Sequence, residues 1–396
     1  MEKIKLPNKR FASVKLGGGI RDIVDMANRI EAGGKKVFHL EIGRPDFDSP
    51  AIAKETAKKA LDGGKVHYAD MRGEIELRKA LAAKLKRENS IIAAESDILV
   101  TVGAQAALMA AMMTSLDAGD EAIIPTPCFG AYVTQTALLG IDVKWARCRM
   151  EDSFVLKAGD IEPLITDRTK MILVNTPNNP TGAVITRRDA EEIAGLAKKH
   201  DLLVISDECY ERFLYKGEHV SIASLPDMAD RTVTVGAASK TYSMTGWRIG
   251  YMVMPSWMTA YANRAHLAMN TCAATFPQYG YAAALNGAED DVQAMIKEYR
   301  ERRDLVVGYL RNMRDLDFVE PEGAFYVLPS VKKTGLSATE FCSFMLEEAG
   351  VALVPGEAFQ SPGFVRIAYC KPKEYLEEAM EKMALALAKL KTAGLK

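Results

Sequence analysis

The sequence predicts an α/β protein with a mostly parallel β-sheet covered by helices on both faces, together with a second, smaller α+β domain. Two observations support this prediction. The middle of the chain alternates short apolar runs with helical stretches, a pattern typical of parallel sheets that are buried on both sides. Beyond residue 289 the pattern changes to one long charged helix followed by a mixture of short strands and helices.

The length of the chain also indicates more than one packed unit. With 396 residues it exceeds what a single small core usually organises. We expect a large domain over 48–288 and a small domain formed by 1–47 and 289–396, because chain ends often meet at a domain surface. A ligand site is then expected in the cleft between the domains.

The elements of the large domain can be placed in chain order. The first strand is expected at Asp97–Thr101, and Gly103 turns the chain into a helix over Ala104–Leu116. A strand over Glu121–Ile124 follows, which we expect Pro125 to end. Four more apolar runs have the length of buried strands: Lys170–Asn175, Leu202–Asp207, Thr232–Val235 and Gly250–Met254. A helix over Arg187–His200 separates the first two of these.

The C-terminal part has the features of an α+β domain. Asp290–Arg314 forms one long, charged, amphipathic segment, which predicts a helix. The expected elements after it are a strand at Ala324–Leu328, a helix at Ala338–Ala349, a strand at Phe364–Tyr369 and a helix at Glu374–Leu390.

Composition excludes several classes of protein. The 51 basic and 52 acidic residues give a formal charge of −1, so no field of one sign is available to hold nucleic acid or an anionic membrane. The uncharged stretches Ile98–Leu116, Ala122–Ile141 and Leu267–Ala288 approach the length of a membrane span, but each contains Gly, Pro, Asn or Gln, and we expect buried core instead. The basic N-terminus lacks an apolar stretch, so no signal peptide is expected.

The cysteines and histidines indicate neither a metal site nor a disulfide framework. The six cysteines contain no CxxC pair, and the five histidines form no HxxxH or HExxH. Free thiols of this kind suit a reducing compartment, so we expect a cytoplasmic protein without a structural metal.

Two charged residues near the ends of predicted strands could carry chemistry. Lys240 follows the Thr232–Val235 strand, and the next charged residue is Arg248, a second cation that would lower the pKa of the lysine and favour its nucleophilic amine. Asp207 ends a buried strand, at the edge where parallel sheets bind ligands. Each alone has an ordinary explanation, a surface lysine or a helix cap.

Three further motifs are equally suggestive and equally ambiguous when taken singly. The turn from Asn175 to Gly182 contains two prolines and can hold Asn179 in one orientation. Gly103 lies at a strand-to-helix junction, where backbone N–H groups can bind an anion. Arg366 is a single arginine in an apolar strand, which if buried needs a carboxylate or phosphate partner. An ordinary turn would also explain each of the first two motifs, and an arginine that faces solvent would explain the third.

Taken together, these motifs resemble the pyridoxal-5′-phosphate-dependent class I and II aminotransferases of fold type I. The resemblance runs from about Leu40 to about Tyr369 and keeps the family's order of motifs. These are Gly43-Arg-Pro-Asp-Phe47, Tyr68 with Gly73, Gly103-Ala-Gln105, Asn175 to Gly182, Asp207-Glu-Cys-Tyr210, Ser239-Lys240 with Gly246-Trp-Arg248, and Arg366. The resemblance implies a sheet of the seven-stranded type and pyridoxal phosphate as the cofactor.

The resemblance also implies a role for each residue around the cofactor ring. Lys240 matches the lysine that binds the cofactor covalently and later moves the proton between substrate Cα and cofactor C4′. Asp207 matches the acid that keeps the pyridine nitrogen protonated, so that the ring withdraws electrons. Asn179 and Tyr210 match the donors to the ring 3′-oxygen, and Phe129 resembles the aromatic residue that stacks on the ring.

The phosphate is expected at one end of the same site. The resemblance implies ligands from the backbone of Gly103, Ala104 and Gln105 and from Ser239 and Arg248. The family usually has Gly or Ser three residues before the lysine, and this chain has Ala237, which leaves more of the anchoring to the other ligands. Tyr68 resembles the tyrosine that reaches the phosphate from a neighbouring subunit, which implies a homodimer.

The substrate is expected opposite the phosphate. Arg366 matches the arginine that grips the substrate α-carboxylate, and Gly43 matches the backbone that approaches the same group, where a side chain would intrude. The implied reaction is a ping-pong transamination, in which an L-amino acid of aspartate or aromatic type, with a specificity that could be broad, donates its amino group to 2-oxoglutarate. The stretch Gly17 to Ile20 is interpreted either as a lid over the substrate or as a disordered leader.

Other functions remain open at this point. A C–S β-lyase, or a related elimination enzyme or synthase, would share Lys240, Asp207 and Arg366, so these residues do not discriminate. A cofactor-binding transcriptional regulator would need a DNA-binding module in front, and only about 40 residues precede the first motif. A Rossmann dehydrogenase is disfavoured because no GxGxxG follows any strand.

Overall fold

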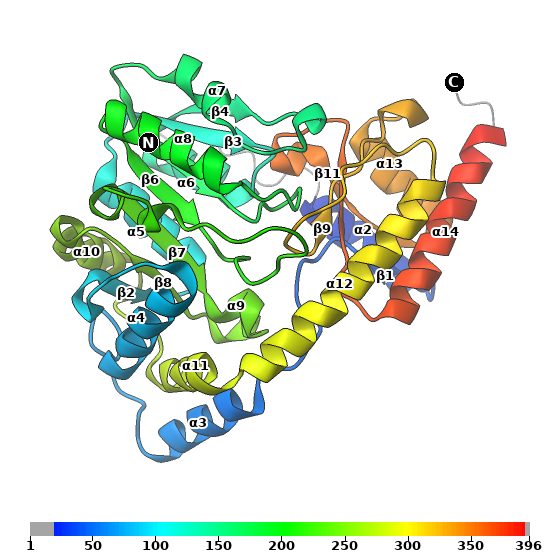
Figure 1. Cartoon of the computed structure of the whole chain (residues 1–396). Coiled ribbons are helices and arrows are strands. Elements are labelled where there is room, and N and C mark those ends of the chain that lie inside the picture. Colours follow the sequence, from blue (N-terminus) through cyan, green and yellow to red (C-terminus); the bar gives the residue numbers. More distant parts are fainter. Residues whose placement is uncertain (1–19, 393–396) are drawn as a thin grey trace, which may run out of the picture.

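The computed structural model describes residues 20–392 and contains a seven-stranded sheet in the order β2-β8-β7-β6-β5-β3-β4 (Figure 1). The strands are β2 (Ile98–Thr101), β3 (Glu121–Thr126), β4 (Asp142–Arg147), β5 (Thr169–Asn175), β6 (Leu203–Asp207), β7 (Thr232–Ala237) and β8 (Gly250–Val253). β8 pairs antiparallel with both neighbours, and the other strands run parallel to one another. The predicted fold class, a mostly parallel sheet in an α/β protein, is confirmed.

Helices cover both faces of the sheet because successive residues of its strands point to opposite sides. In β5, Met171 and Leu173 pack on one face, with side chains from α5 (Ala104–Ser115) and α10 (Thr259–Asn270). Ile172 and Val174 pack on the other face, with α8 (Arg187–Lys199). The remaining helices of this part are α3 (Ala51–Asp62), α4 (Ile75–Asn89), α6 (Gly130–Leu139), α7 (Ala158–Ile161), α9 (Ala238–Thr241) and α11 (Thr275–Gly287).

The structure corrects two local predictions and adds one strand. β3 continues through Pro125 to Thr126, because its pairing with β5 ends at Ile123 and Pro125 lies where the strand pairs only with β4. The first strand begins at Ile98 instead of Asp97, which ends a short 3₁₀ turn. The edge strand β4 was not predicted, since only one of its residues is fully buried and it lacks an apolar run.

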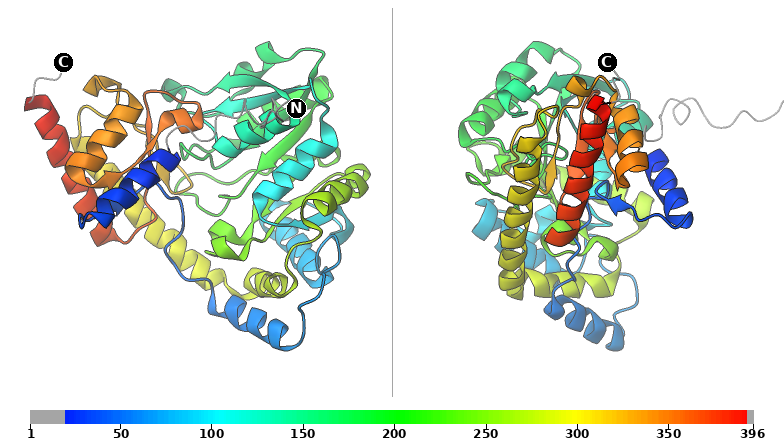
Figure 2. Two further views of the ribbon diagram at one scale, coloured as in Figure 1. Left: turned by 180° about the vertical axis from the view of Figure 1, so that it is seen from behind. Right: turned by 90° about the vertical axis from the view of Figure 1, so that its right-hand side faces the viewer.

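The second part of the molecule is built from the chain's two ends. Its elements are α2 (Ile20–Ala32), β1 (Phe38–His39), α12 (Glu289–Asn312), β9 (Tyr326–Val327), α13 (Ala338–Phe344) with a π-helical turn over Met345–Ala349, β10 (Val351–Ala352), β11 (Val354–Pro355), β12 (Val365–Ala368) and α14 (Lys373–Thr392). The strands expected at 324–328 and 364–369 are therefore present but shorter. β1 pairs with β10, so the N-terminal segment joins the C-terminal elements, and Figure 2 shows α2 beside them.

A shared hydrophobic core joins these elements. It combines Phe38 and Leu40 from the N-terminal segment with side chains of α12, α13 and α14. Tyr210 and Phe213, which follow β6, pack into the same core. α12 runs from α11 to α14 (Figure 1), so this helix spans the two parts of the molecule. No helix among residues 20–392 is both long and apolar enough to cross a membrane.

Candidate functional site

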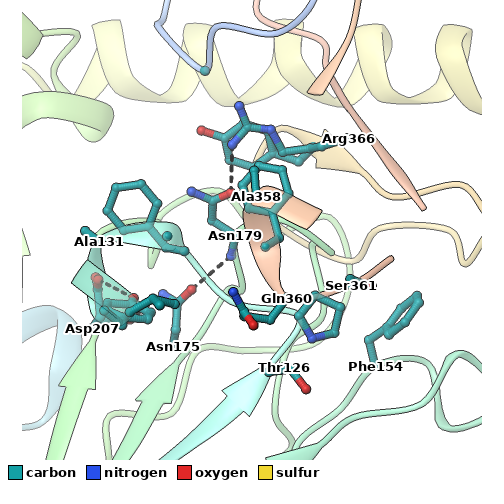
Figure 3. Close-up of a pocket in the computed structure, with 18 of the residues that line it drawn as sticks. Thr126, Ala131, Phe154, Asn175, Asn179, Asp207, Ala358, Gln360, Ser361 and Arg366 are labelled. Atoms are coloured by element: carbon teal, nitrogen blue, oxygen red, sulfur yellow. Dashed lines mark hydrogen bonds between the residues drawn. The ribbon is translucent and has the colours of Figure 1, made fainter. Parts of the chain in front are cut away.

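A cavity of about 1770 Å³ lies where the carboxyl ends of the central strands meet the second part of the molecule. Asn175 ends β5 and Asp207 ends β6, and both line this cavity. Because parallel strands place their carboxyl ends at one edge, the loops that follow them converge there. The close-up in Figure 3 shows residues from these loops facing the segment that carries Arg366.

Lys240 lies in this cavity and is half-buried in the short helix α9, which follows β7. Its Nζ donates a hydrogen bond of 2.7 Å to the backbone oxygen of Gly43. Burial lowers the pKa of the Lys240 ammonium, and the positive charges of Arg366 and Arg248 lower it further. The side chain is therefore closer to a neutral, nucleophilic amine than an exposed lysine is.

Asp207 is a buried carboxylate without a basic partner among the described residues. Tyr132 Oη donates to its Oδ2 at 2.7 Å, and the Cys209 N–H donates to its Oδ1 at 3.1 Å. Burial raises the pKa of Asp207, and these hydrogen bonds only partly oppose the rise. A cation placed beside this carboxylate would favour its ionised form.

Asn179 is held in one orientation by the turn that follows β5. Its backbone N–H donates to Asn175 Oδ1 at 2.9 Å, and its own Oδ1 accepts from Arg366 Nη1 at 3.1 Å. Figure 3 shows Asn179 between these two residues. Gly182 closes the turn at a φ of +73°, where a Cβ would lie 2.4 Å from Pro321 Cβ, so glycine is required at this position.

Arg366 is buried in β12 and has no carboxylate partner among the described residues. Its Nη2 donates to the Glu41 backbone oxygen at 2.6 Å, while its buried Nε has no hydrogen-bond partner in this part of the chain. The guanidinium lies between the rings of Tyr326 and Phe359, 4.5 and 4.6 Å from their centroids. The predicted carboxylate partner of this arginine is thus not supplied by these parts of the protein, and an anionic ligand would satisfy it.

A second group of donors lies at the start of α5. Gly103 has a φ of +75°, and a Cβ there would lie 2.5 Å from Arg248 Nη2, so the guanidinium packs directly against the glycine. Gly250 is equally confined, since its Cβ would lie 2.6 Å from the Ala104 backbone N. Arg248 is exposed and has no acidic partner among the residues described. Its Nη1 donates to the Thr245 backbone oxygen at 3.0 Å, which leaves its charge without a counterion in this part of the chain. A helix N-terminus with such a guanidinium beside it suits a phosphate.

Most residues that the sequence predicted for the site line this one cavity. They are Gly43, Ala104, Gln105, Phe129, Asn179, Asp207, Tyr210, Ser239, Lys240, Arg248 and Arg366. Gly103 lies just behind Arg248 instead of on the cavity wall. Tyr68 does not line the cavity of its own chain and is 82% exposed. Gly17, Gly18 and Gly19 of the suggested lid lie outside the described residues, and nothing is described of the Ile20 side chain.

Four residues at the site were missed by sequence reasoning. Tyr132 bonds to Asp207, Tyr326 and Phe359 enclose Arg366, and the Glu41 backbone supports it. Tyr132 could have been found, because it lies three residues after the predicted stacking residue Phe129, and their rings meet edge to face at 5.8 Å. Tyr326 and Phe359 give no local signal, since aromatic residues in strands and loops are usually core. Glu41 acts through its backbone oxygen, which every residue type carries.

These donors fit pyridoxal phosphate. Among the described residues neither Asp207 nor Arg248 has a partner of opposite charge. The buried carboxylate of Asp207 suits a protonated pyridine nitrogen, and the guanidinium of Arg248 at the start of α5 suits the phosphate. Lys240, whose pKa is lowered by burial, lines the same cavity.

Comparison with known proteins agrees with this geometry. The family model "Aminotransferase class I and II" matches residues 35–383. The chain is 43% identical to aromatic-amino-acid aminotransferase 2 of Thermococcus litoralis and 44% identical to an aspartate aminotransferase of Pyrococcus abyssi, in each case over 94% of this chain and 96% of the relative. The solved structure of Thermus thermophilus aspartate aminotransferase with maleate superposes with a TM-score of 0.92 at 36% identity, covering 98% of this chain and all of that one.

The resemblance inferred from the motifs is thereby confirmed, and with it the fold and the cofactor. The matched region contains the sheet, the cavity and every residue predicted for the site. The chain belongs to the class I and II aminotransferases, the pyridoxal-phosphate-dependent enzymes of fold type I.

Proposed function

We propose that this enzyme transfers the amino group of an L-amino acid of aspartate or aromatic type to 2-oxoglutarate by a ping-pong mechanism. Relatives named as aromatic and as aspartate aminotransferases match this chain about equally well, at 43% and 44% identity. That balance supports a donor range that includes both types and does not favour one of them.

One observation carries the proposal that the substrate is an α-amino acid. Lys240 Nζ and Arg366 Nη2 donate to backbone oxygens of the same short segment, at Gly43 (2.7 Å) and Glu41 (2.6 Å). The segment thus holds a nucleophilic amine and a carboxylate-binding guanidinium side by side. An α-amino acid presents a carboxylate on the carbon next to its reacting nitrogen and would engage both groups at once.

Lys240 is proposed to remove the proton from the substrate Cα and to deliver it to C4′ of the cofactor. When bound, pyridoxal phosphate supplies an aldehyde for the amine and a protonated ring that withdraws electrons. The lowered pKa of Lys240 makes its neutral amine available as the base. Arg366 binds the substrate carboxylate, and Asn179 orients Arg366.

The residues around the ring are proposed to hold it and to set its charge. Asp207 keeps the ring nitrogen protonated, while Phe129 packs against the ring face. Asn179 and Tyr210 donate to the 3′-oxygen. Burial raises the pKa of Tyr210, whose hydroxyl lies 2.9 Å from that of Tyr326, so the phenol stays neutral and remains a donor.

The phosphate is proposed to lie at the start of α5. The N–H groups of Ala104 and Gln105 lie at the positive end of the helix dipole, and Arg248 adds a full charge. The Gly103 N–H, which was also predicted as a ligand, instead donates to the Thr101 backbone oxygen at 2.8 Å. Ser239 supplies a hydroxyl from the cavity wall. Ala237, also on the wall, supplies none.

We propose that the enzyme works as a homodimer with Tyr68 reaching the partner's phosphate site. The high exposure of this tyrosine, away from its own cavity, supports that role. We also propose the division into 48–288 and 1–47 with 289–396, supported by the hydrophobic core that joins Phe38 to the C-terminal helices. The six free cysteines support a cytoplasmic location.

The test is the visible absorbance of the purified holoenzyme as single amino acids are added without any oxo acid. Loss of the lysine-bound cofactor band, with one equivalent of 2-oxo acid formed per site, is the expected half-reaction. Subsequent addition of 2-oxoglutarate should restore the band and give glutamate. A persistent band with release of ammonia and pyruvate would instead identify a lyase.

A further inference from the structure

A buried network of polar and charged side chains lies behind the turn that carries Asp207 and Tyr210. Its centre is Glu208, which is 1% exposed. The Glu208 carboxylate accepts hydrogen bonds from side chains of three separate segments. The donors are Ser206 Oγ (2.8 Å), Asn89 Nδ2 (3.1 Å), Ser221 Oγ (2.6 Å) and His219 Nε2 (2.8 Å). The turn is therefore hydrogen-bonded to the protein interior through Glu208.

Within this network His219 is the positive partner available to Glu208. The nearby Glu211 pairs with Lys84, which lies in α4. The remaining charged groups continue outward as a chain of ion pairs, Lys84 with Glu88, Glu88 with Arg212, and Arg212 with Glu289. With His219 protonated, the inner charges of Glu208, Glu211, Lys84 and His219 balance. With His219 neutral, one buried negative charge is left over.

That charge would lie next to the residue proposed to pair with the cofactor ring. Asp207 and Glu208 are consecutive in the chain, so a single peptide unit separates the residues that carry the two carboxylates. Asp207 lines the cavity, whereas Glu208 does not and accepts hydrogen bonds in the buried network instead. Burial raises the pKa of Asp207, and the negative charge of Glu208 adds to the rise. An unbalanced Glu208 thus acts against the ionised form of Asp207.

The environment of His219 favours its charged form. Burial lowers the pKa of His219, but the carboxylates of Glu208 and Glu211 outweigh this effect, and the pKa lies above its ordinary value. A raised pKa in the folded state means that the positive charge is fully present at low pH and is lost as the pH rises through that value.

We propose that His219 is a positioning and charge-balancing residue for Asp207: it neutralises Glu208 and so keeps the adjacent carboxylate ionised for the cofactor ring. The inference rests on the role proposed above for Asp207. His219 does not line the cavity and acts through its neighbours.

The test compares His219→Gln, Glu208→Gln and the double variant as holoenzymes. The measured quantity is the pH midpoint at which the visible band of the lysine-bound cofactor changes. Losing a positive charge raises the pKa of neighbouring groups and losing a negative charge lowers it. We expect His219→Gln to shift the midpoint upward and Glu208→Gln downward, each by about half a pH unit for one charge in a partly screened interior. The double variant should return towards the wild type.

Kinetics provide a second readout. Below the pH at which Asp207 titrates, its ionised fraction falls about tenfold per pH unit, so a half-unit rise of its pKa lowers that fraction about threefold. On this acid limb we expect kcat of His219→Gln to fall about threefold with KM almost unchanged, and the double variant should recover part of the loss. Shifts of both single variants in one direction, or no shift, would overturn the proposal, because loss of packing has no charge sign. If Glu208→Gln does not fold, His219→Lys, which keeps the charge, replaces it and should retain the wild-type midpoint.

A matched control is His39→Gln. His39 Nδ1 lies 2.7 Å from the buried Glu41 carboxylate, so it is also a His–Glu pair. It lies on β1, neither it nor the Glu41 side chain lines the cavity, and neither is adjacent in the chain to Asp207. This variant should leave the midpoint unchanged. A failure of the proposed role of Asp207 would be seen separately, as an Asp207→Asn variant whose band and rate match the wild type.

Discussion

Tyr132 donates a 2.7 Å hydrogen bond to the carboxylate of Asp207, and both side chains are buried. Tyr132 belongs to α6, which begins just after Phe129, whereas Asp207 ends β6. One helix start therefore supplies both an aromatic ring on the cavity wall and a partner for the acid. This contact joins two predicted site residues, Phe129 and Asp207, through a third that sequence reasoning overlooked.

The contact predicts the effect of Tyr132→Phe. The hydrogen bond lowers the pKa of Asp207 against the effect of burial, so its loss should raise that pKa. We expect the acid limb of the pH–rate profile to move to higher pH and kcat to fall about tenfold, as for a lost hydrogen bond to a charged group. Tyr309→Phe, which removes a tyrosine hydroxyl that contacts Glu381, is the control and should leave the profile unchanged.

Lys240→Ala should abolish the visible band of the lysine-bound cofactor. Transamination should fall by at least about a thousandfold, because both the covalent link and the base are removed. The measurements are the absorbance spectrum after addition of pyridoxal phosphate and the rate of oxo-acid formation. Lys332→Ala, at an exposed lysine on the cavity rim, should retain the band. Full activity of Lys240→Ala would refute the proposed role.

Arg366→Ala should weaken the binding of every α-amino acid irrespective of its side chain. We expect KM to rise about a hundredfold, since a buried, hydrogen-bonded charge partner of the substrate is lost. Arg366→Lys should recover only part of the loss, because an ammonium cannot reproduce the planar fork between Tyr326 and Phe359. A defect limited to acidic substrates would show that Arg366 contacts the substrate side chain instead.

Two neighbouring glycines should differ in their tolerance of alanine. At Gly250 a Cβ would lie 2.5 Å from the Gly103 backbone carbon, so the start of α5 would have to move. At Gly246 nothing lies within 4 Å of the added atom. We expect Gly250→Ala to bind pyridoxal phosphate at least about tenfold more weakly in a cofactor titration, while Gly246→Ala matches the wild type. Equal affinities would contradict the proposed phosphate site.

His39 should make a pH-dependent contribution to the free energy of unfolding. Burial lowers the pKa of His39, but Glu41 and Glu31 outweigh it, so the folded pKa lies above the usual value. The stabilisation is present below the unfolded pKa of about 6.5 and is lost as the pH rises through the folded value. The difference in unfolding free energy between wild type and His39→Gln should therefore shrink from about pH 5 to about pH 9. A difference that is constant across this range would show that protonation of His39 does not stabilise the fold.

Much of the fold was predictable because its signals are local. The apolar runs of β5, β6 and β7 and the amphipathic pattern of α12 occupy consecutive residues, and their periods are set by backbone geometry. β4 was missed because an edge strand is half exposed and needs no apolar run. Pro125 was misread because whether a proline is tolerated in a strand depends on which neighbour pairs with it, and the sequence does not show this.

The family and the cofactor were predictable from the sequence alone, as were candidates for the residues of the site, since these lie in short motifs whose order is preserved along the chain. The contacts that each of these residues makes follow from the three-dimensional packing. Tyr132 and Asp207 are 75 positions apart, Gly43 and Lys240 are 197 apart, and Glu41 and Arg366 are 325 apart. Such contacts depend on how the sheet edge and the two chain ends pack against each other, and no local pattern of residues encodes that packing.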